Sequence, residues 1–221
     1  ITLALSMLLA SLGTSIVNIA LPTLVEMFAL PFFQVQAVVI GYLVSLTISV
    51  VVAGRLGDRY GCKSMLIVGL VIFSFASLLC SFAPNLWSLV AARSFQGIGA
   101  AFLMTLAMAL TRQTVSQSHM GRAMGMLGTI SAVGTALGPV LGGLLIATLG
   151  WRSIFGLQCV LAGITIILAW MTLPIDSSRI AISSVGSWKI DQRIMPNLLV
   201  NLLVATIMMT TLVVGPFYLG L

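Results

Sequence analysis

The sequence predicts an all-α polytopic membrane protein, and three observations lead to this prediction. Hydrophobic residues make up 60% of the 221-residue chain, and the mean hydropathy is +1.19. Only 6% of the residues are charged. Several runs without Asp, Glu, Lys or Arg exceed the roughly 20 residues that a helix needs to cross the hydrocarbon. One soluble core cannot hide so much apolar surface, and in lipid such runs satisfy their backbone groups only as helices.

Turn signals divide these runs into seven expected spans. A Leu-Pro pair at 30–31 separates the first from the second, and Ala-Pro-Asn at 83–85 separates the third from the fourth. The expected spans are residues 2–25, 35–56, 64–83, 86–111, 122–149, 151–173 and 195–219. The chain begins at Ile1 and stops at Leu221 without a polar tail, so we expect a fragment of a longer protein.

The net charge of +6 is a signal of orientation in the membrane. Eight of the ten Lys and Arg residues follow the second, fourth or sixth span: Arg55, Arg59, Lys63, Arg112, Arg122, Arg179, Lys189 and Arg193. The opposite connections hold only Arg152. This bias predicts a multi-pass protein of the cell membrane with its N-terminus in the cytoplasm. The lipid bilayer, and not nucleic acid, is therefore the expected surrounding partner.

No pattern in the chain indicates an enzyme. It holds one His and four carboxylates, without nucleophile–base spacing or a nucleotide-binding loop. Cys62, Cys80 and Cys159 lie far apart, which favours packing roles over a metal site or a disulfide framework. We expect no catalytic residue, no metal and no cofactor.

In the first span, Thr14, Ser15 and Asn18 place hydroxyl and amide groups within about one turn. An amide is rarely placed in lipid without a partner. Asn18 therefore either lines a pathway or bonds across to another helix.

After the second span, the stretch GRLGDRYGCKSML at 54–66 gathers four charged residues. We expect a tight cytoplasmic turn, in which Gly57 and Gly61 permit unusual backbone angles and close approach of the helix ends. Its charges either anchor the loop at the membrane surface or form a latch. In the latch, Asp58 accepts hydrogen bonds from a helix N-terminus or pairs with a neighbouring arginine such as Arg112.

The fourth span contains Arg93, the only charge expected within the hydrocarbon. It lies roughly 10 Å from the outer end of its helix. An intramembrane charge costs roughly 3 kcal/mol or more, so it should face the bundle interior, water or a partner. Gln96 lies three residues on, on the same side. An outward reach to the interface is the alternative, but the depth and the nearby Gln favour a cavity.

The fifth span reads GMLGTISAVGTALGPVLGG. Gly134, Gly138 and Gly142 recur every four residues and predict a smooth groove, with Gly143 beside it. Pro139 lacks an amide donor and should bend the helix. The groove either provides static packing, or it provides a bend or a sliding surface that is used when two halves of the protein rock against each other.

Together these residues resemble the major facilitator superfamily, in particular its drug:proton antiporter branch. The cytoplasmic pattern matches at Gly54, Leu56, Asp58, Arg59, Gly61 and Lys63. The fourth-span pattern matches at Leu89, Arg93, Gln96, Gly97, Gly99, Ala100 and Ala101. The fifth-span antiporter pattern matches at Gly125, Gly134, Gly138, Pro139, Gly142 and Gly143. The stretch IVNIALP at 16–22 and Trp151-Arg152 resemble the drug exporters.

The resemblance implies two six-helix halves, each built from inverted three-helix repeats, that work by alternating access. Residues 1–173 would be the N-terminal half, 174–193 a cytoplasmic linker, and 194–221 the first helix of a truncated C-terminal half in a twelve-helix transporter. It also implies a latch between the halves at Asp58 and Arg59, a role for Arg93 in proton coupling or substrate binding, and a role for the fifth-span glycines in export.

Three positions depart from the family pattern. Gly13 stands where the drug exporters commonly carry an Asp, Cys62 replaces a usual basic residue, and the sixth span has 157–160 in place of Asn-Pro. The first departure leaves Arg93 without a carboxylate partner in these spans. The coupling carboxylates then lie in the missing C-terminal half, or Arg93 holds an anionic substrate.

The sequence thus leads to one main hypothesis and two rivals. The main one is a secondary transporter that exports small amphipathic compounds in exchange for protons. Its substrate and proton pathway comprises Thr14, Asn18, Arg93 and Gln96, and its latch comprises Gly54, Asp58, Arg59, Gly61, Lys63 and Arg112. The rivals are a transporter of an organic anion or metabolite bound by Arg93, and a non-transporting half-size membrane protein.

Overall fold

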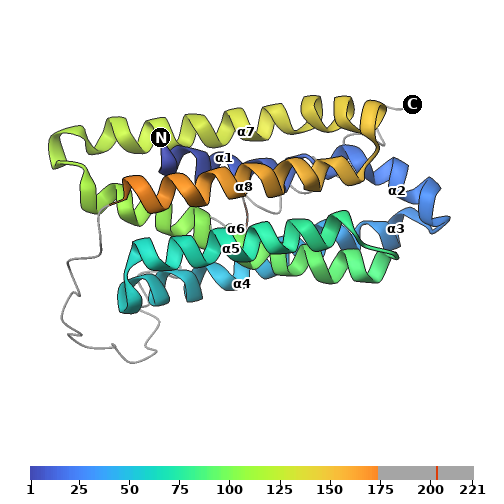
Figure 1. Ribbon diagram of the computed structural model, residues 1–221, viewed down its shortest axis with the longest axis horizontal. Coiled ribbons are helices and arrows are strands. Elements are labelled where there is room, and N and C mark those ends of the chain that lie inside the picture. The colour runs from blue at the N-terminus through green and yellow to red at the C-terminus, as the bar shows by residue number, and fades with distance from the viewer. Residues whose placement is uncertain (174–202, 204–221) are drawn as a thin grey trace. The chain divides into compact units, whose positions relative to one another are not determined.

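The computed structural model describes residues 1–173 and Leu203 (Figure 1). Within these residues, six helical spans are long and apolar enough to cross a membrane. The described part of the chain contains helices and no strand, which confirms the predicted all-α class. The predicted linker at 174–193 and the predicted seventh span at 195–219 lie outside the described residues.

The spans are built from the following helices. The first contains α1 (Thr2–Ser15), the short 3-10 helix η1 (Asn18–Ala20) and α2 (Leu21–Phe28), and the second contains α3 (Phe32–Val35) and α4 (Ala37–Tyr60). The third is α5 (Cys62–Ser81), the fourth is α6 (Leu86–Thr114), the fifth contains η2 (Gln117–His119) and α7 (Met120–Leu149), and the sixth is α8 (Arg152–Thr172).

The turn expected between the second and third spans, over residues 57–63, is wrong in its extent. Helix α4 continues through Tyr60 and α5 begins at Cys62, so that Gly61 alone separates them. Gly61 has φ 95° and ψ 135°, a backbone conformation that glycine adopts far more readily than other residues. Arg59 lies in the last turn of α4, where a cation is favourable to the helix dipole. The charged residues therefore extend the helix and do not interrupt it.

The six spans pack as two matching sets of three. Helix α6 packs on α4 and α5, and in the same way α1 packs on α7 and α8 (Figure 1). Burial inside the structure follows the same correspondence. Of an apolar 18-residue stretch in each span, 61% is buried in both the first and fourth spans and 17% in both the second and fifth. The buried share is 39% for the third and 33% for the sixth. This correspondence agrees with two related three-helix repeats, in which the first and fourth spans are the innermost.

Glycines allow close approach at two equivalent helix crossings. A Cβ atom added to Gly97 of α6 would lie 2.3 Å from the carbonyl oxygen of Tyr42 on α4. A Cβ atom added to Gly138 of α7 would lie 2.0 Å from Oγ of Ser15 on α1. Small residues at these points let the backbones approach, which is a main source of packing energy between helices in lipid.

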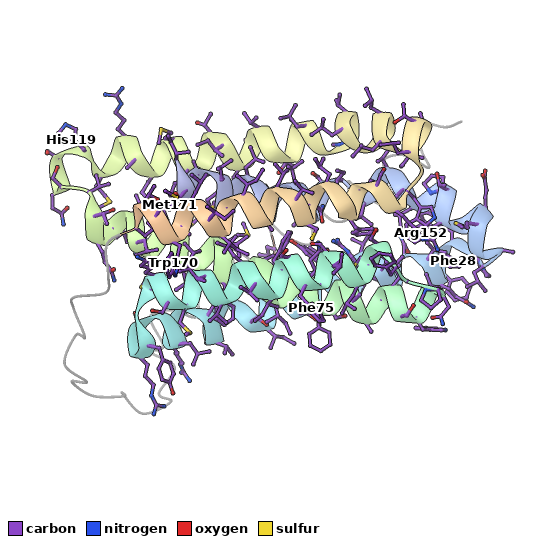
Figure 2. The ribbon with its side chains drawn as sticks, in the orientation of Figure 1. Phe28, Phe75, His119, Arg152, Trp170 and Met171 are labelled. Carbon is purple, nitrogen blue, oxygen red and sulfur yellow. The ribbon has the colours of Figure 1, made fainter. Side chains whose placement is uncertain are left out.

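Trp151 and Arg152, at the junction of the fifth and sixth spans, contact the other connections between spans at the predicted outer end of the bundle. Arg152 Nη2 donates to the Ala83 carbonyl at 3.2 Å, and the Arg152 carbonyl accepts from Ser81 Oγ at 3.3 Å. The Trp151 ring meets Phe28 edge-on at a centroid distance of 6.1 Å. Figure 2 shows Arg152 and Phe28 at the end of the helices opposite His119. Three connections between spans are therefore tied together at this end.

We expect Gly97→Ala and Gly138→Ala to lower the thermal midpoint of the protein, because overpacking a close crossing costs about 1–3 kcal/mol. Gly143→Ala is the matched control, since no atom from another part of the described residues lies within 4 Å of its added Cβ. This control should leave the midpoint unchanged or raise it slightly, because Ala favours a helix over Gly by about 1 kcal/mol. Thermal unfolding in lipid nanodiscs measures the three midpoints. Equal midpoints for Gly97→Ala and Gly143→Ala would contradict the close crossing.

Candidate functional site

Arg93 lies inside the helix bundle with an exposed fraction of 0%. Its Nη2 atom donates a hydrogen bond to the carbonyl oxygen of Gly13 on α1 at 2.9 Å. Its Nη1 atom donates to Oε1 of Gln96, one turn further along α6. The guanidinium thus links the two innermost spans directly, and it does not reach the membrane surface.

Aromatic rings surround the same guanidinium. Its central carbon lies 4.1 Å from the centroid of the Tyr42 ring and 5.9 Å from that of Phe155. The Tyr42 hydroxyl donates to the Ala10 carbonyl at 3.2 Å, which holds the ring in place. Within residues 1–173, the hydrogen-bond acceptors of Arg93 are uncharged oxygens. The buried cation is therefore stabilised by carbonyl dipoles and π faces, without a carboxylate in contact.

Gln96 extends these contacts to two more helices. Its Nε2 atom donates to Oγ of Ser77 on α5 and to Oε1 of Gln158 on α8, both at 2.6 Å. The Ser77 hydroxyl in turn donates to the Phe73 carbonyl at 2.7 Å. We use the term polar network for five residues on four spans: Gly13, Ser77, Arg93, Gln96 and Gln158. Among the described residues, two buried donors of this network lack a hydrogen-bond partner, Arg93 Nε and Gln158 Nε2.

The helical hydrogen bonding of the first span is interrupted next to the polar network, although the backbone keeps right-handed helical angles there. Helix α1 ends at Ser15, and its last hydrogen bond runs from the Ile16 amide to the Leu12 carbonyl at 2.9 Å. Ile16 and Val17 separate α1 from η1, and we call these two residues the break. In the described part of the chain, the Gly13 carbonyl accepts from Arg93 and not from the amide of Val17, four residues on.

Thr14 and Asn18, on either side of the break, are half-buried. The Thr14 hydroxyl donates to the Ser11 carbonyl at 2.7 Å, within its own helix. The structure therefore brings Arg93 and Gln96 into direct contact in the core, while Thr14 and Asn18 are the more accessible polar groups beside them.

The residues assigned to the latch lie at the predicted cytoplasmic end. Lys63 Nζ donates to the carbonyl of Leu173, just after α8, and so ties the start of α5 to the end of the sixth span. The Arg59 guanidinium lies 5.2 Å from the centroid of the Tyr60 ring. Asp58 and Arg112 are both exposed, and the described residues show no ion pair between them. Gly54 is near Thr105 of α6, at 3.8 Å from an added Cβ.

The fifth-span glycines divide into two groups. Gly134 and Gly138 face α1, and Gly142 faces Ile16 and Ile19, further along the first span. Ser131 of α7 shares a hydrogen bond of 2.6 Å with Ser11. The other two are Gly125 and Gly143. An added Cβ at either would lie more than 4 Å from the atoms of every other described helix. Helix α7 continues through the exposed Pro139.

Sequence reasoning missed four residues that contact the arginine or its amide partner: Gly13 as an acceptor, Tyr42, Ser77 and Gln158. Gln158 offered a signal, because it is a lone amide in an otherwise apolar span. Ser77 and Tyr42 offered none, since single hydroxyl groups are common in apolar helices. Gly13 contributes only its backbone carbonyl, which every residue has.

Comparison with known proteins identifies the relatives of this chain. The model of the Major Facilitator Superfamily matches residues 3–221. The riboflavin transporter RibZ of Clostridioides difficile is 33% identical over 174 residues, which cover 79% of this chain and 38% of RibZ. The methylenomycin A resistance protein of Bacillus subtilis is 34% identical over 186 residues, covering 82% of this chain and 40% of that protein. The chain thus spans less than half the length of these curated relatives.

The fold is also found among solved structures. The xylose transporter XylE from E. coli, in a partially occluded inward-open conformation, superposes with a TM-score of 0.70 at 18% identity. The superposition covers 78% of this chain and 48% of XylE. The family match extends over nearly the whole chain, and the identity to the two curated proteins and the shared fold agree with it. The chain therefore belongs to the major facilitator superfamily.

Proposed function

We propose that this chain is the N-terminal half, with the start of the C-terminal half, of a secondary transporter in the plasma membrane. The transporter exports small amphipathic compounds in exchange for protons, by alternating access. The observation that carries the proposal of export is the similarity to a methylenomycin A resistance protein over 82% of the chain. The correspondence of the first three spans with the last three supports the proposed mechanism, because transporters built from such repeats work by a rocking of repeats or halves against each other.

In this proposal Thr14, Asn18, Arg93 and Gln96 form the N-terminal side of the substrate and proton pathway. Thr14 and Asn18 contact the solutes, since they are the accessible polar groups of the first span's centre. Arg93 and Gln96 lie deeper in the bundle than Thr14 and Asn18 and act from the core, because both have an exposed fraction of 0%.

The proposal assigns two further groups to the rocking movement. The latch residues hold the cytoplasmic ends of the two halves together in the outward-facing state: Gly54, Asp58, Arg59, Gly61, Lys63 and Arg112. The α7 groove formed by Gly134, Gly138 and Gly142 is the smooth surface along which the fifth span shifts on the first.

Proton coupling needs a titratable group, and the described residues hold two carboxylates, Glu26 and Asp58. Both are exposed and neither contacts Arg93. We therefore place the coupling carboxylates in the C-terminal half of the complete protein.

A second candidate is a transporter of an organic anion or metabolite. It is favoured by the unpartnered Arg93 Nε, a buried donor that an anionic group of a substrate would satisfy, and by the similarity to a riboflavin transporter. This candidate requires the site to open, because Arg93 has no exposed surface in the described state.

Transport is tested with the complete encoded protein in inside-out membrane vesicles, with ethidium as the amphipathic probe. We expect a proton gradient to drive ethidium accumulation, and a protonophore to abolish it. Vesicles without the protein are the control. Equal accumulation in both preparations would rule out export of such compounds. Gradient-independent uptake of labelled riboflavin by the same vesicles would then favour the metabolite transporter. A half-size, non-transporting protein would move neither probe, and its gene would end near Leu221.

Substitutions of Arg93 separate a requirement for charge from a requirement for two parallel hydrogen bonds. We expect Arg93→Met to abolish ethidium transport and to lower the thermal midpoint modestly, because Met leaves Gln96 Oε1 and the Gly13 carbonyl without this donor. Arg93→Lys should retain part of the transport in the antiporter and lose it in a transporter that binds a carboxylate with both guanidinium nitrogens. Full transport by Arg93→Met would overturn both roles.

Labelling of single cysteines tests the orientation. In a background without the three native cysteines, Ser118→Cys and Pro84→Cys place one thiol each at exposed positions of opposite ends. A membrane-impermeant maleimide should label Ser118→Cys only in inside-out vesicles and Pro84→Cys only in intact cells. The reverse pattern would show that the N-terminus is outside.

A further inference from the structure

We propose that Ser77 and Gln158 are positioning residues for Arg93, and that the polar network couples the sixth span to the break in the first. Ser77 and Gln158 orient Gln96, Gln96 orients Arg93, and Arg93 occupies the Gly13 carbonyl, so that the first span stays broken beside Thr14 and Asn18. The consequence for transport rests on the proposed function, whereas the structural coupling does not.

The first step concerns the cause of the break. Pro22 cannot donate to the carbonyl of Asn18, and that carbonyl accepts from Leu21 in a 3-10 arrangement instead. This explains the irregular backbone from Asn18 onward. It does not explain why the Val17 amide leaves the Gly13 carbonyl, a bond that lies five residues earlier in the chain. The bond from Arg93 Nη2 at 2.9 Å explains it, because a charged donor competes well for a buried carbonyl oxygen.

The second step concerns the direction of the Gln96 amide. Arg93 is a pure donor, so Gln96 must present its Oε1 atom to it and its Nε2 atom to the opposite side. On that side both neighbours accept: Gln158 offers Oε1, and Ser77 offers Oγ while its own hydrogen goes to the Phe73 carbonyl. A flipped amide would face two acceptors with its oxygen and the guanidinium with its donors. Placed in this way, Ser77 and Gln158 stabilise the orientation of Gln96 that supports Arg93.

Two groups of this network cost free energy and do not stabilise the fold. Gln158 Nε2 and Arg93 Nε are buried without a hydrogen-bond partner in the described part of the chain, and each such donor costs free energy. Apolar residues of the same size would fill the same space without that cost. The contacts are better explained by a conformational role, in which a shift of α8 against α6 releases Gln96, frees Arg93 and lets the Val17 amide return to the Gly13 carbonyl.

The decisive measurement is hydrogen exchange of the peptide covering residues 13–20 in the complete protein, read by mass spectrometry. We expect Ser77→Ala combined with Gln158→Leu to slow exchange of this peptide about tenfold, because the released carbonyl re-forms a helical bond with Val17. Thr165→Val is the matched control. Thr165 is equally buried on α8, but its hydroxyl bonds only to the Leu161 carbonyl of its own helix. It should leave the exchange unchanged.

Transport gives the second readout. In ethidium efflux the double variant should lower the maximal rate about tenfold and leave KM unchanged, because the affected step is a conformational change and not binding. Ser77→Ala with Gln158→Glu should recover the rate, since a Glu oxygen still accepts from Gln96. If the double variant is not found in the membrane, Gln158→Leu alone provides the same test, with an expected change of about threefold.

The possible outcomes are distinct. Unchanged exchange at residues 13–20 in a folded double variant overturns the coupling, whatever the transport result. Slower exchange in a protein that moves no probe supports the coupling and rejects the proposed function. A change of the same size in Thr165→Val also overturns the proposal, because it would show a general response of α8 to substitution.

Discussion

A guanidinium buried among hydrocarbon helices is the constraint on which the rest of this structure depends. Arg93 has no exposed surface among the described residues, so the residues around it must supply acceptors for its donors. It does so with a backbone carbonyl from the first span, an amide from its own helix, and aromatic rings from the second and sixth. The polar side chains of otherwise apolar spans gather at this point for the same reason.

These contacts require helix axes that are unusually close. Gly97 allows the α4 backbone to lie against α6, which brings the Tyr42 ring over the guanidinium. On the other side of the bundle, Gly138 allows α7 to pack against α1 close to Gly13. The two crossings are equivalent in the two three-helix sets, and each supports one of the two innermost spans that Arg93 joins. The close helix crossings and the polar contacts of Arg93 thus lie next to each other in the bundle.

A large part of this was predictable from the sequence. The charge-free runs placed six spans within a few residues of their observed ends, because a helix that crosses lipid must be long and apolar. The pair of Arg93 and Gln96 followed from helical spacing. The turn at 57–63 was predicted too long, since charges at the end of a membrane helix do not stop it. Helix α4 continues to Tyr60, and the unusual backbone angles of Gly61 end it.

The sequence by itself determined the class of fold, the membrane as solvent, the order of the spans and the presence of one cation that needs internal partners. These features depend on composition and on neighbours within one or two helical turns. Only the tertiary structure decided who those partners are. Gly13 lies 80 residues from Arg93, and Gln158 lies 62 residues from Gln96, so their contacts depend on how each helix is rotated and how closely it packs. The bond from Arg93 to the Gly13 carbonyl and the bonds from Gln96 to Ser77 and Gln158 have no pattern along the chain, because they form only where separate helices meet.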